Sequence, residues 1–194
     1  MIDIPADGRV LDVATGTGDV ALEVARQLPA SVSITGADFS AEMVARGQQK
    51  IKASPYHDRI SFTVAPCEDL PFPDNHFDAI TIAFGIRNVV DRRLGLAELW
   101  RVAKPEGQLF ILEFSTPKSA LFRGLYHLYF KQILPVIGGL FSQYDAYKYL
   151  PDSVLEFPTT EQFCETMRSV GFSDVRCIPL TFGIASIYSG KKRP

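Results

Sequence analysis

Hydrophobic positions along the chain follow two alternating patterns. Short runs rich in Val, Ile and Phe are separated by segments in which apolar residues recur every three or four positions. This alternation is typical of βαβ units and predicts a parallel sheet covered by helices. The predicted strands cover residues 10–14, 32–37, 60–65, 77–84 and 108–114, followed by a closing pair at 174–179 and 183–189.

Residues that cap helices and form turns mark the ends of the predicted helices. Ser40 can cap one helix, with Glu42 in its first turn, and Gly171 can end the last one. Pro105-Glu106-Gly107 stops a helix and turns the chain into the strand at 108–114. The helix that Gly171 can end is predicted at residues 160–170, and two earlier helices are predicted at residues 20–28 and 92–103.

The length and composition indicate one globular domain over residues 1–194. Hydrophobic residues make up 46% and charged residues 22% of the 194 residues, which is typical of a folded core. Between about 119 and 157 the strand pattern gives way to an apolar helical insertion. The segment 121–141 contains Arg, His, Lys and Pro, so we do not expect it to span a membrane.

Charge and cysteine content exclude several classes of function. A net charge of −2 gives no basic face for nucleic acid. The three cysteines, Cys67, Cys164 and Cys177, form no C-x-x-C pair, and the three histidines are scattered, so we expect neither a metal site nor disulfides. With no apolar leader at the start of the chain, a cytoplasmic location is expected.

The loop after the first strand contains the first candidate binding site. Gly16 and Gly18 allow a sharp turn and a close approach to a ligand, and the helix that follows favours negative groups at its N-terminus. Asp12 can accept a ligand ammonium, and Asp38, at the end of the second strand, can accept two ribose hydroxyls. The same spacing also fits the dinucleotide fingerprint of NAD-dependent oxidoreductases. However, an acid stands at Asp12 just before the glycines, and the sheet ends in a hairpin instead of a second mononucleotide half.

Several further segments resemble a known class of enzymes. The glycine loop, residues 70–78, residues 100–107 and the closing hairpin are similar to class I S-adenosylmethionine-dependent methyltransferases. The resemblance implies a doubly wound, mostly parallel seven-stranded α/β sheet, with a reversed seventh strand between strands five and six. Within this class, four segments resemble the ubiquinone/menaquinone C-methyltransferase family: residues 84–89, 112–115, 144–150 and 180–185.

The resemblance also implies a cofactor site. Thr17 and the glycine-loop backbone would hold the methionyl part of S-adenosylmethionine, and Asp38 would bind the ribose. The full implied set is Asp12, Gly16, Thr17, Gly18, Asp38, Phe39, Pro66, Cys67, Glu68 and Ala83. Pro66 replaces the usual Asp or Asn, so the backbone N–H of Cys67, with Glu68 as a substitute, would contact adenine. Ala14 replaces the usual first glycine.

The implied reaction is methylation of a ring carbon of a prenylated quinol, most simply demethylmenaquinol, with S-adenosylhomocysteine as the other product. Arg87 would stabilise the quinol oxyanion or orient a water, because an arginine side chain stays protonated at neutral pH and cannot act as a base by itself. An ordinary surface salt bridge is the alternative for Arg87. Asn88, Tyr144 and Asp145 complete the candidate catalytic set. A methyltransferase for another small molecule or lipid, and a non-catalytic binding protein, remain alternatives.

The family pattern leads to three further expectations. The segment 119–157 would cover the prenylated substrate, or simply pack in the core. Peripheral contact with the inner face of a membrane and a homodimer are compatible with the family. Family members carry a helical segment ahead of the first strand, whereas only a few residues precede it here. A site without that segment is expected to exclude water less well and to turn over more slowly.

Overall fold

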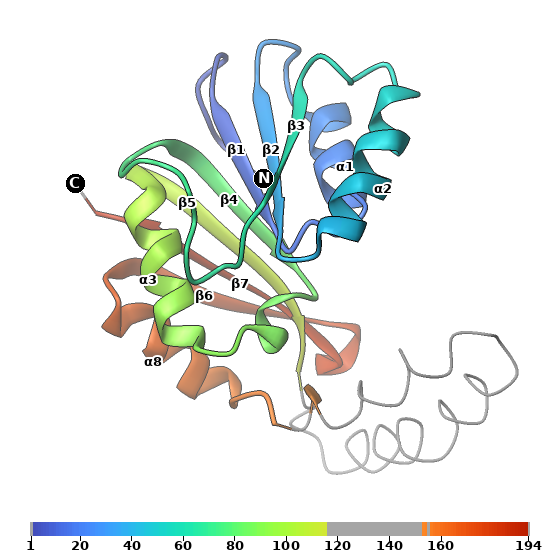
Figure 1. Cartoon of the computed structure of the whole chain (residues 1–194). Coiled ribbons are helices and arrows are strands. Elements are labelled where there is room, and N and C mark those ends of the chain that lie inside the picture. The colour runs from blue at the N-terminus through green and yellow to red at the C-terminus, as the bar shows by residue number, and fades with distance from the viewer. Residues whose placement is uncertain (1, 116–152, 155, 194) are drawn as a thin grey trace, which may run out of the picture.

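The computed structural model describes residues 2–115, 153–154 and 156–193, which form a sheet with helices on both faces (Figure 1). The strands are β1 (Arg9–Val13), β2 (Ser33–Asp38), β3 (Ile60–Val64), β4 (Phe77–Ala83), β5 (Ala103–Phe114), β6 (Phe172–Leu180) and β7 (Ala185–Lys192). The helices are α1 (Asp19–Gln27), α2 (Ala41–Lys52), α3 (Arg92–Val102) and α8 (Thr160–Ser169), with 3₁₀ turns η1 (Ile86–Asn88) and η3 (Thr181–Gly183).

The sheet has the predicted doubly wound topology. Its strand order is β3-β2-β1-β4-β5-β7-β6. β1 pairs in parallel with both β2 and β4, whereas β7 runs antiparallel to both β5 and β6. The prediction of a reversed last strand between strands five and six is therefore confirmed. The chain changes direction along the sheet between β1 and β4, and in open α/β sheets ligands bind at the carboxyl ends of the strands beside such a point.

Two apolar layers bury the two faces of the sheet. On one face α1 and α2 pack over β1–β3, around buried residues such as Val10 and Ile34. On the other face α3 and α8 pack over β4–β7, around Leu11, Ile80 and Ile111 (Figure 1). Neighbouring residues of β1 belong to different layers because successive side chains of a strand point to opposite faces. Burial on both faces explains the continuous apolar runs of the central strands.

The helix ends follow the predicted capping residues. The Ser40 side chain accepts a hydrogen bond from the Met43 N–H at 3.3 Å. Gly171 follows α8 with φ of +115°, and its N–H donates to the Arg168 carbonyl oxygen, which closes the helix.

Three predicted strand starts are wrong. β6 begins at Phe172 instead of residue 174, because Phe172 already pairs with Lys192. β5 begins at Ala103 instead of residue 108, because Ala103 already pairs with Phe77. The register then jumps to the pair Ala79 and Gln108, so Pro105-Glu106-Gly107 forms a bulge within the strand. β7 begins at Ala185 instead of residue 183, because η3 occupies the preceding residues with three positive φ values.

Most of the predicted helical insertion at 119–157 lies outside the described residues. Near its end, Val154 and Phe157 are buried, and the Phe157 ring lies 4.9 Å from that of Phe163. Among the helices that the structure describes, none is long and apolar enough to cross a membrane.

The bulge in β5 leads to a stability prediction. A Cβ at position 107 would lie 2.7 Å from the Lys104 carbonyl oxygen and 3.1 Å from that of Phe77. Because these are backbone atoms, Gly107→Ala is expected to lower the free energy of unfolding in urea by about 1–3 kcal/mol. Glu106→Gly is the matched control. It removes a side chain at φ of +64° and should be neutral or stabilise by up to about 1 kcal/mol. Equal stability of the alanine variant and the wild type would contradict this reading of the bulge.

Candidate active site

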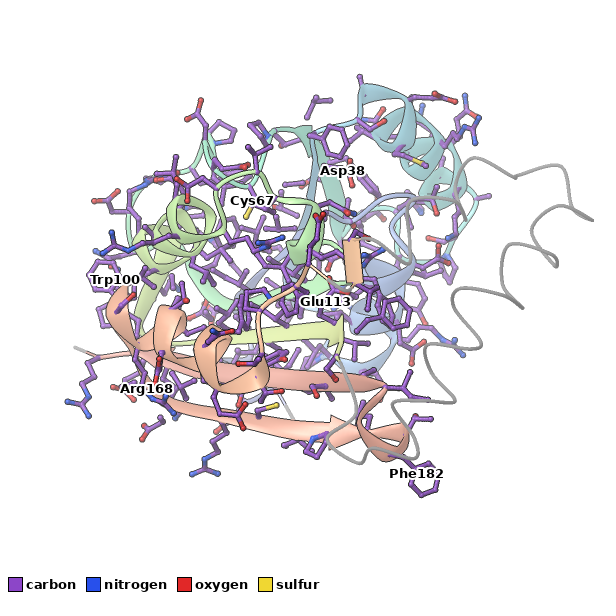
Figure 2. The ribbon with its side chains drawn as sticks, turned by 90° about the horizontal axis from the view of Figure 1, so that it is seen from below. Asp38, Cys67, Trp100, Glu113, Arg168 and Phe182 are labelled. Carbon is purple, nitrogen blue, oxygen red and sulfur yellow. The ribbon has the colours of Figure 1, made fainter. Side chains whose placement is uncertain are left out.

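The candidate residues gather at the carboxyl ends of the central parallel strands. Asp12, Asp38 and Ala83 lie at or beside the ends of β1, β2 and β4, which are neighbours in the sheet. Figure 2 labels Asp38, Cys67 and Glu113, which come from β2, the loop after β3 and β5. The topology thus brings together the residues that the sequence indicated as a cofactor site.

The glycine loop leaves open space beside its backbone. Gly16 and Gly18 have φ values of +55° and +80°, which glycine adopts without strain. A Cβ at Gly16 would meet nothing within 4 Å among the described residues. The loop leads into α1, whose N-terminus has no side-chain cap, and Thr17 donates to Asp19 in its first turn at 2.9 Å. The Gly16 and Gly18 N–H groups already donate to Asp38 and to the Thr15 carbonyl oxygen. The uncapped first turn of α1 is therefore the part of this loop that suits the carboxylate of a ligand.

Asp38 ties the glycine loop to the start of α2. Its Oδ2 accepts the Gly16 N–H at 2.8 Å, and its Oδ1 accepts the Ser40 N–H at 2.9 Å. The residue is 6% exposed. A carboxylate has about four lone pairs, so both oxygens can still accept from a ligand. This geometry suits a pair of neighbouring hydroxyls such as those of a ribose.

Asp12 lies beneath the loop and is almost fully buried. Thr15 Oγ1 and Thr81 Oγ1 donate to its two oxygens at 2.6 and 2.7 Å. The pKa of this carboxyl is raised to about 6, mainly by burial and in small part by the charge of Asp38, while hydrogen bonds from the two hydroxyls and from the Ala21 backbone oppose the shift. We infer that Asp12 favours a cationic ligand group through its charge. Thr15 and Thr81 were not among the residues predicted for the site. Their signal was a hydroxyl inside the glycine loop and another inside an apolar strand.

The residues expected around adenine differ in how they are placed. Cys67 is buried, which raises the pKa of its thiol to about 12 and keeps it neutral, whereas Pro66 is exposed. Phe39 is 74% exposed beside Asp38. Glu68 Oε1 accepts the backbone N–H groups of Val90 and Asp91 at 2.9 and 3.3 Å. Glu68 therefore holds the segment that leads into α3.

Arg87 is buried in an ion pair, so the alternative of a surface salt bridge is wrong. Its side chain is 6% exposed, and NH1 donates to Glu113 Oε1 at 2.8 Å and also to the Phe84 carbonyl oxygen. Its Nε is buried without a hydrogen-bond partner among the described residues, so the guanidinium is incompletely satisfied. Asn88 follows on η1 and is exposed. Glu113 was not among the predicted site residues, although a Glu at an inward position of an apolar strand is a visible signal in the sequence.

The cofactor loop and the turn that holds Arg87 touch each other. Ala14 and Phe84 directly follow β1 and β4, and both have positive φ values, of 53° and 55°. A Cβ on Gly85 would lie 2.3 Å from the Cβ of Ala14. Strained backbone of this kind collects at functional sites, and here it joins the two halves of the candidate site.

The remaining candidates and surface features lie elsewhere. Tyr144 and Asp145 are outside the described residues.

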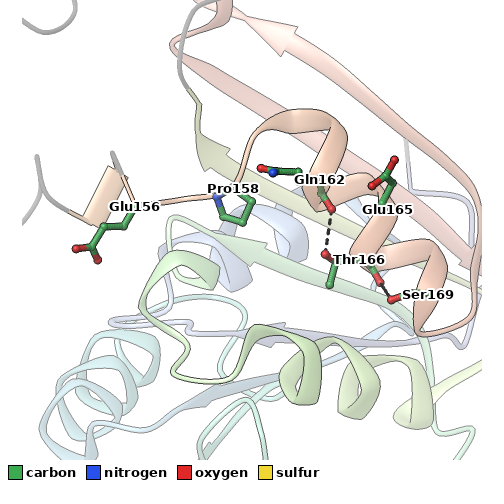
Figure 3. A pocket seen from close by; sticks show the side chains of 6 residues that line it. All are labelled: Glu156, Pro158, Gln162, Glu165, Thr166 and Ser169. Atoms are coloured by element: carbon green, nitrogen blue, oxygen red, sulfur yellow. Dashed lines mark hydrogen bonds between the residues drawn. The ribbon is translucent and has the colours of Figure 1, made fainter.

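The shallow hollow of Figure 3 follows α8 and is lined by Glu156, Pro158, Gln162, Glu165, Thr166 and Ser169. None of these belongs to the candidate site, and two of the hydroxyls donate within their own helix. Within the described ranges, no three His, Cys, Asp or Glu side chains are grouped as metal ligands.

Comparisons with known proteins are consistent with this arrangement. Residues 3–192 match the ubiE/COQ5 methyltransferase family. The chain is 64% identical over 186 residues to the ubiquinone/menaquinone biosynthesis C-methyltransferase UbiE of Geotalea daltonii, covering 96% of this chain and 79% of that protein. It is 42% identical over 193 residues to the demethylmenaquinone methyltransferase of Porphyromonas gingivalis, covering 99% and 79%.

Solved structures share the fold at low sequence identity. A SAM-dependent methyltransferase from Aquifex aeolicus aligns with a TM-score of 0.70 at 18% identity, over 98% of this chain and 85% of that one. The [4+2]-cyclase SpnF aligns with a TM-score of 0.69 at 20% identity, over 96% and 75%. Because the second name is that of a cyclase, the fold alone does not identify a reaction.

The raised pKa of Asp12 leads to a pH prediction. Its pKa is about 6 in the folded chain against an ordinary value of 3.8, so the folded state binds this proton more tightly. The resulting stability is present at low pH and is lost as the pH rises through about 6. The free energy of unfolding of the wild type, relative to Asp12→Asn, should fall by about 2 kcal/mol between about pH 4.5 and 7.5. Urea titrations of both proteins measure this difference, and a flat difference would contradict the assignment.

Proposed function

The chain belongs to the ubiE/COQ5 methyltransferase family, and from this premise we propose that it transfers a methyl group from S-adenosylmethionine to a ring carbon of a polyprenylated quinol, most simply demethylmenaquinol. The observation that carries the proposal is the family match over residues 3–192. Relatives that are 42–64% identical bear names for this chemistry. The site geometry supports it, because acids and a glycine loop lie at the topological switch point.

The cofactor half of the site fits S-adenosylmethionine. Asp38 accepts the ribose hydroxyls with the lone pairs that Gly16 and Ser40 leave free. Thr17 and the glycine-loop backbone that leads into the uncapped start of α1 hold the methionyl part, while buried Asp12 favours its ammonium. The Cys67 backbone N–H and Ala83 lie on the adenine side, with Phe39, Pro66 and Glu68 around it.

The acceptor half must activate an aromatic carbon. S-adenosylmethionine would supply a methyl group on a cationic sulfur. The carbon–sulfur bond would break as the new carbon–carbon bond forms, with S-adenosylhomocysteine as the leaving group, and the ring carbon would then pass its proton to a water. The ring attacks well only when a neighbouring hydroxyl is deprotonated. Arg87 stabilises that oxyanion through its guanidinium, and Asn88 holds the same oxygen. Alignment of the two reactants by rigid strands and turns supplies much of the rate.

Four finer parts of the proposal rest on the family resemblance and on the nature of the substrate. Tyr144 and Asp145 assist at the acceptor, and the segment 119–157 of this single domain covers the substrate. Because a prenylated quinol dissolves in lipid, the protein contacts a membrane surface peripherally while it works. We also propose that the protein forms a homodimer.

A titration tests the cofactor half. By calorimetry we expect micromolar binding of S-adenosylhomocysteine and no binding of NAD. Asp38→Ala should lower the affinity for S-adenosylhomocysteine at least tenfold, which is about 1.4 kcal/mol, because the acceptor for the ribose hydroxyls is lost. Asp78→Ala is the matched control. Asp78 pairs with Lys104 near the opposite end of β4 and should not affect cofactor affinity. Binding of NAD in place of S-adenosylhomocysteine would support the dehydrogenase alternative.

A turnover assay tests the acceptor half. With S-adenosylmethionine, demethylmenaquinol should give menaquinol, detected by mass spectrometry, faster than the corresponding benzoquinol is methylated. Arg87→Ala should lower turnover at least tenfold, about 1.4 kcal/mol in the barrier, with S-adenosylhomocysteine affinity unchanged. Unchanged turnover would remove Arg87 from the mechanism. Sound cofactor binding without any methylated quinol would contradict the proposed substrate.

A further inference from the structure

Glu113 is a buried acid to which the proposed reaction assigns no role. It stands on β5 at 0% exposure, on the same face of the strand as the buried apolar residues Leu109 and Ile111. An ionised carboxylate in such surroundings is strongly unfavourable unless it is paired and hydrogen-bonded. Its presence among apolar neighbours therefore calls for a specific partner.

That partner is Arg87, which binds both oxygens of Glu113. NH1 of Arg87 donates to Oε1 at 2.8 Å, and the backbone N–H of Arg87 donates to Oε2 at 3.2 Å. The Phe114 N–H completes the set at 2.8 Å, and the guanidinium carbon lies 5.5 Å from the centre of the Phe114 ring. Burial raises the pKa of Glu113, and the charge of Arg87 acts in the opposite direction. Glu113 thus fixes both the backbone and the side chain of Arg87.

Stability is a weak explanation for this ion pair. Replacing a buried ion pair by apolar residues of similar volume is often neutral or stabilising, since the pair must first be desolvated. The electrostatics of the site offer a stronger explanation. The proposed cofactor carries a positive sulfur, and an uncompensated arginine in the same weakly solvated site would repel it.

We propose that Glu113 is a positioning residue that holds Arg87 at the acceptor site and cancels its charge, so that the site admits a cationic methyl donor beside an arginine. This inference rests on the proposed function, in which Arg87 faces the acceptor oxygen. The charge of Glu113 governs discrimination between S-adenosylmethionine and S-adenosylhomocysteine, which differ at the sulfur by one methyl group and one positive charge. The length of its side chain governs where the guanidinium lies.

Calorimetric affinities for the two ligands test the role of the charge. Glu113→Gln keeps the shape and removes the charge, and it should weaken S-adenosylmethionine about fivefold relative to S-adenosylhomocysteine. In an Arg87→Met background the same substitution should leave the affinity ratio unchanged, because a Glu113 buried without its cation takes up a proton and is then as neutral as glutamine. Glu106→Gln, an equal charge change at the exposed bulge of β5, is the control and should also leave the ratio unchanged.

Two further variants keep the proposal falsifiable if Glu113→Gln does not fold, which thermal melting will show. Arg87→Gln removes the cation. Its ratio of S-adenosylmethionine affinity to S-adenosylhomocysteine affinity should be equal to or higher than that of the wild type. Glu113→Asp retains the charge and shortens the side chain. It should keep the ratio and lower kcat. A Glu113→Gln effect that is equal for both ligands, or that persists without Arg87, would overturn the inference, as would a lowered ratio in Arg87→Gln. If the wild type does not bind S-adenosylhomocysteine, the proposed function itself fails.

Discussion

The close approach of the chain after β1 to the chain after β4 is the constraint on which the candidate site depends. Ala14 and Gly85 meet so tightly that a Cβ on Gly85 would lie 2.3 Å from that of Ala14. The contact forms where the sheet reverses its winding, and both turns contain residues with positive φ. It places the loop that would hold the cofactor against the turn that carries Arg87. The separation between the two halves of the proposed site is thus fixed by the backbone itself.

Around this contact the protein buries two acids in separate places, and satisfies them in different ways. Asp12 is satisfied by two threonine hydroxyls beneath the glycine loop, whereas Glu113 is satisfied mainly by Arg87 on the other face of the sheet. Asp12 is an anion at the proposed cofactor end, and Arg87 is a cation at the proposed acceptor end whose charge is compensated by Glu113. This arrangement suits a reaction between a positively charged methyl donor and a deprotonated quinol. A dry site strengthens both effects, because low local polarity increases every charge interaction.

The sequence was most informative where local rules and the overall topology agree. Alternating apolar periods predicted the strands and helices, and Ser40 and Gly171 fixed two helix ends. The start of β5 was missed because a bulge at Pro105-Glu106-Gly107 looks like a turn, and only the pairing of Ala103 with Phe77 shows that the strand continues. Asp12 and Asp38 could be placed from their positions at strand ends. The pairing of Arg87 with Glu113 could not, because it joins residues 26 positions apart whose contact depends on the sheet register.

The most direct test of the account is to locate the transferred methyl group. The wild-type chain would be incubated with S-adenosylmethionine carrying a deuterated methyl group and with demethylmenaquinol, and the product examined by mass spectrometry and NMR. A site that stabilises a quinol oxyanion while its ring attacks predicts the labelled methyl on the ring carbon next to the oxygen. A label on a quinol oxygen, or an unlabelled quinol recovered despite sound binding of S-adenosylhomocysteine, would contradict it.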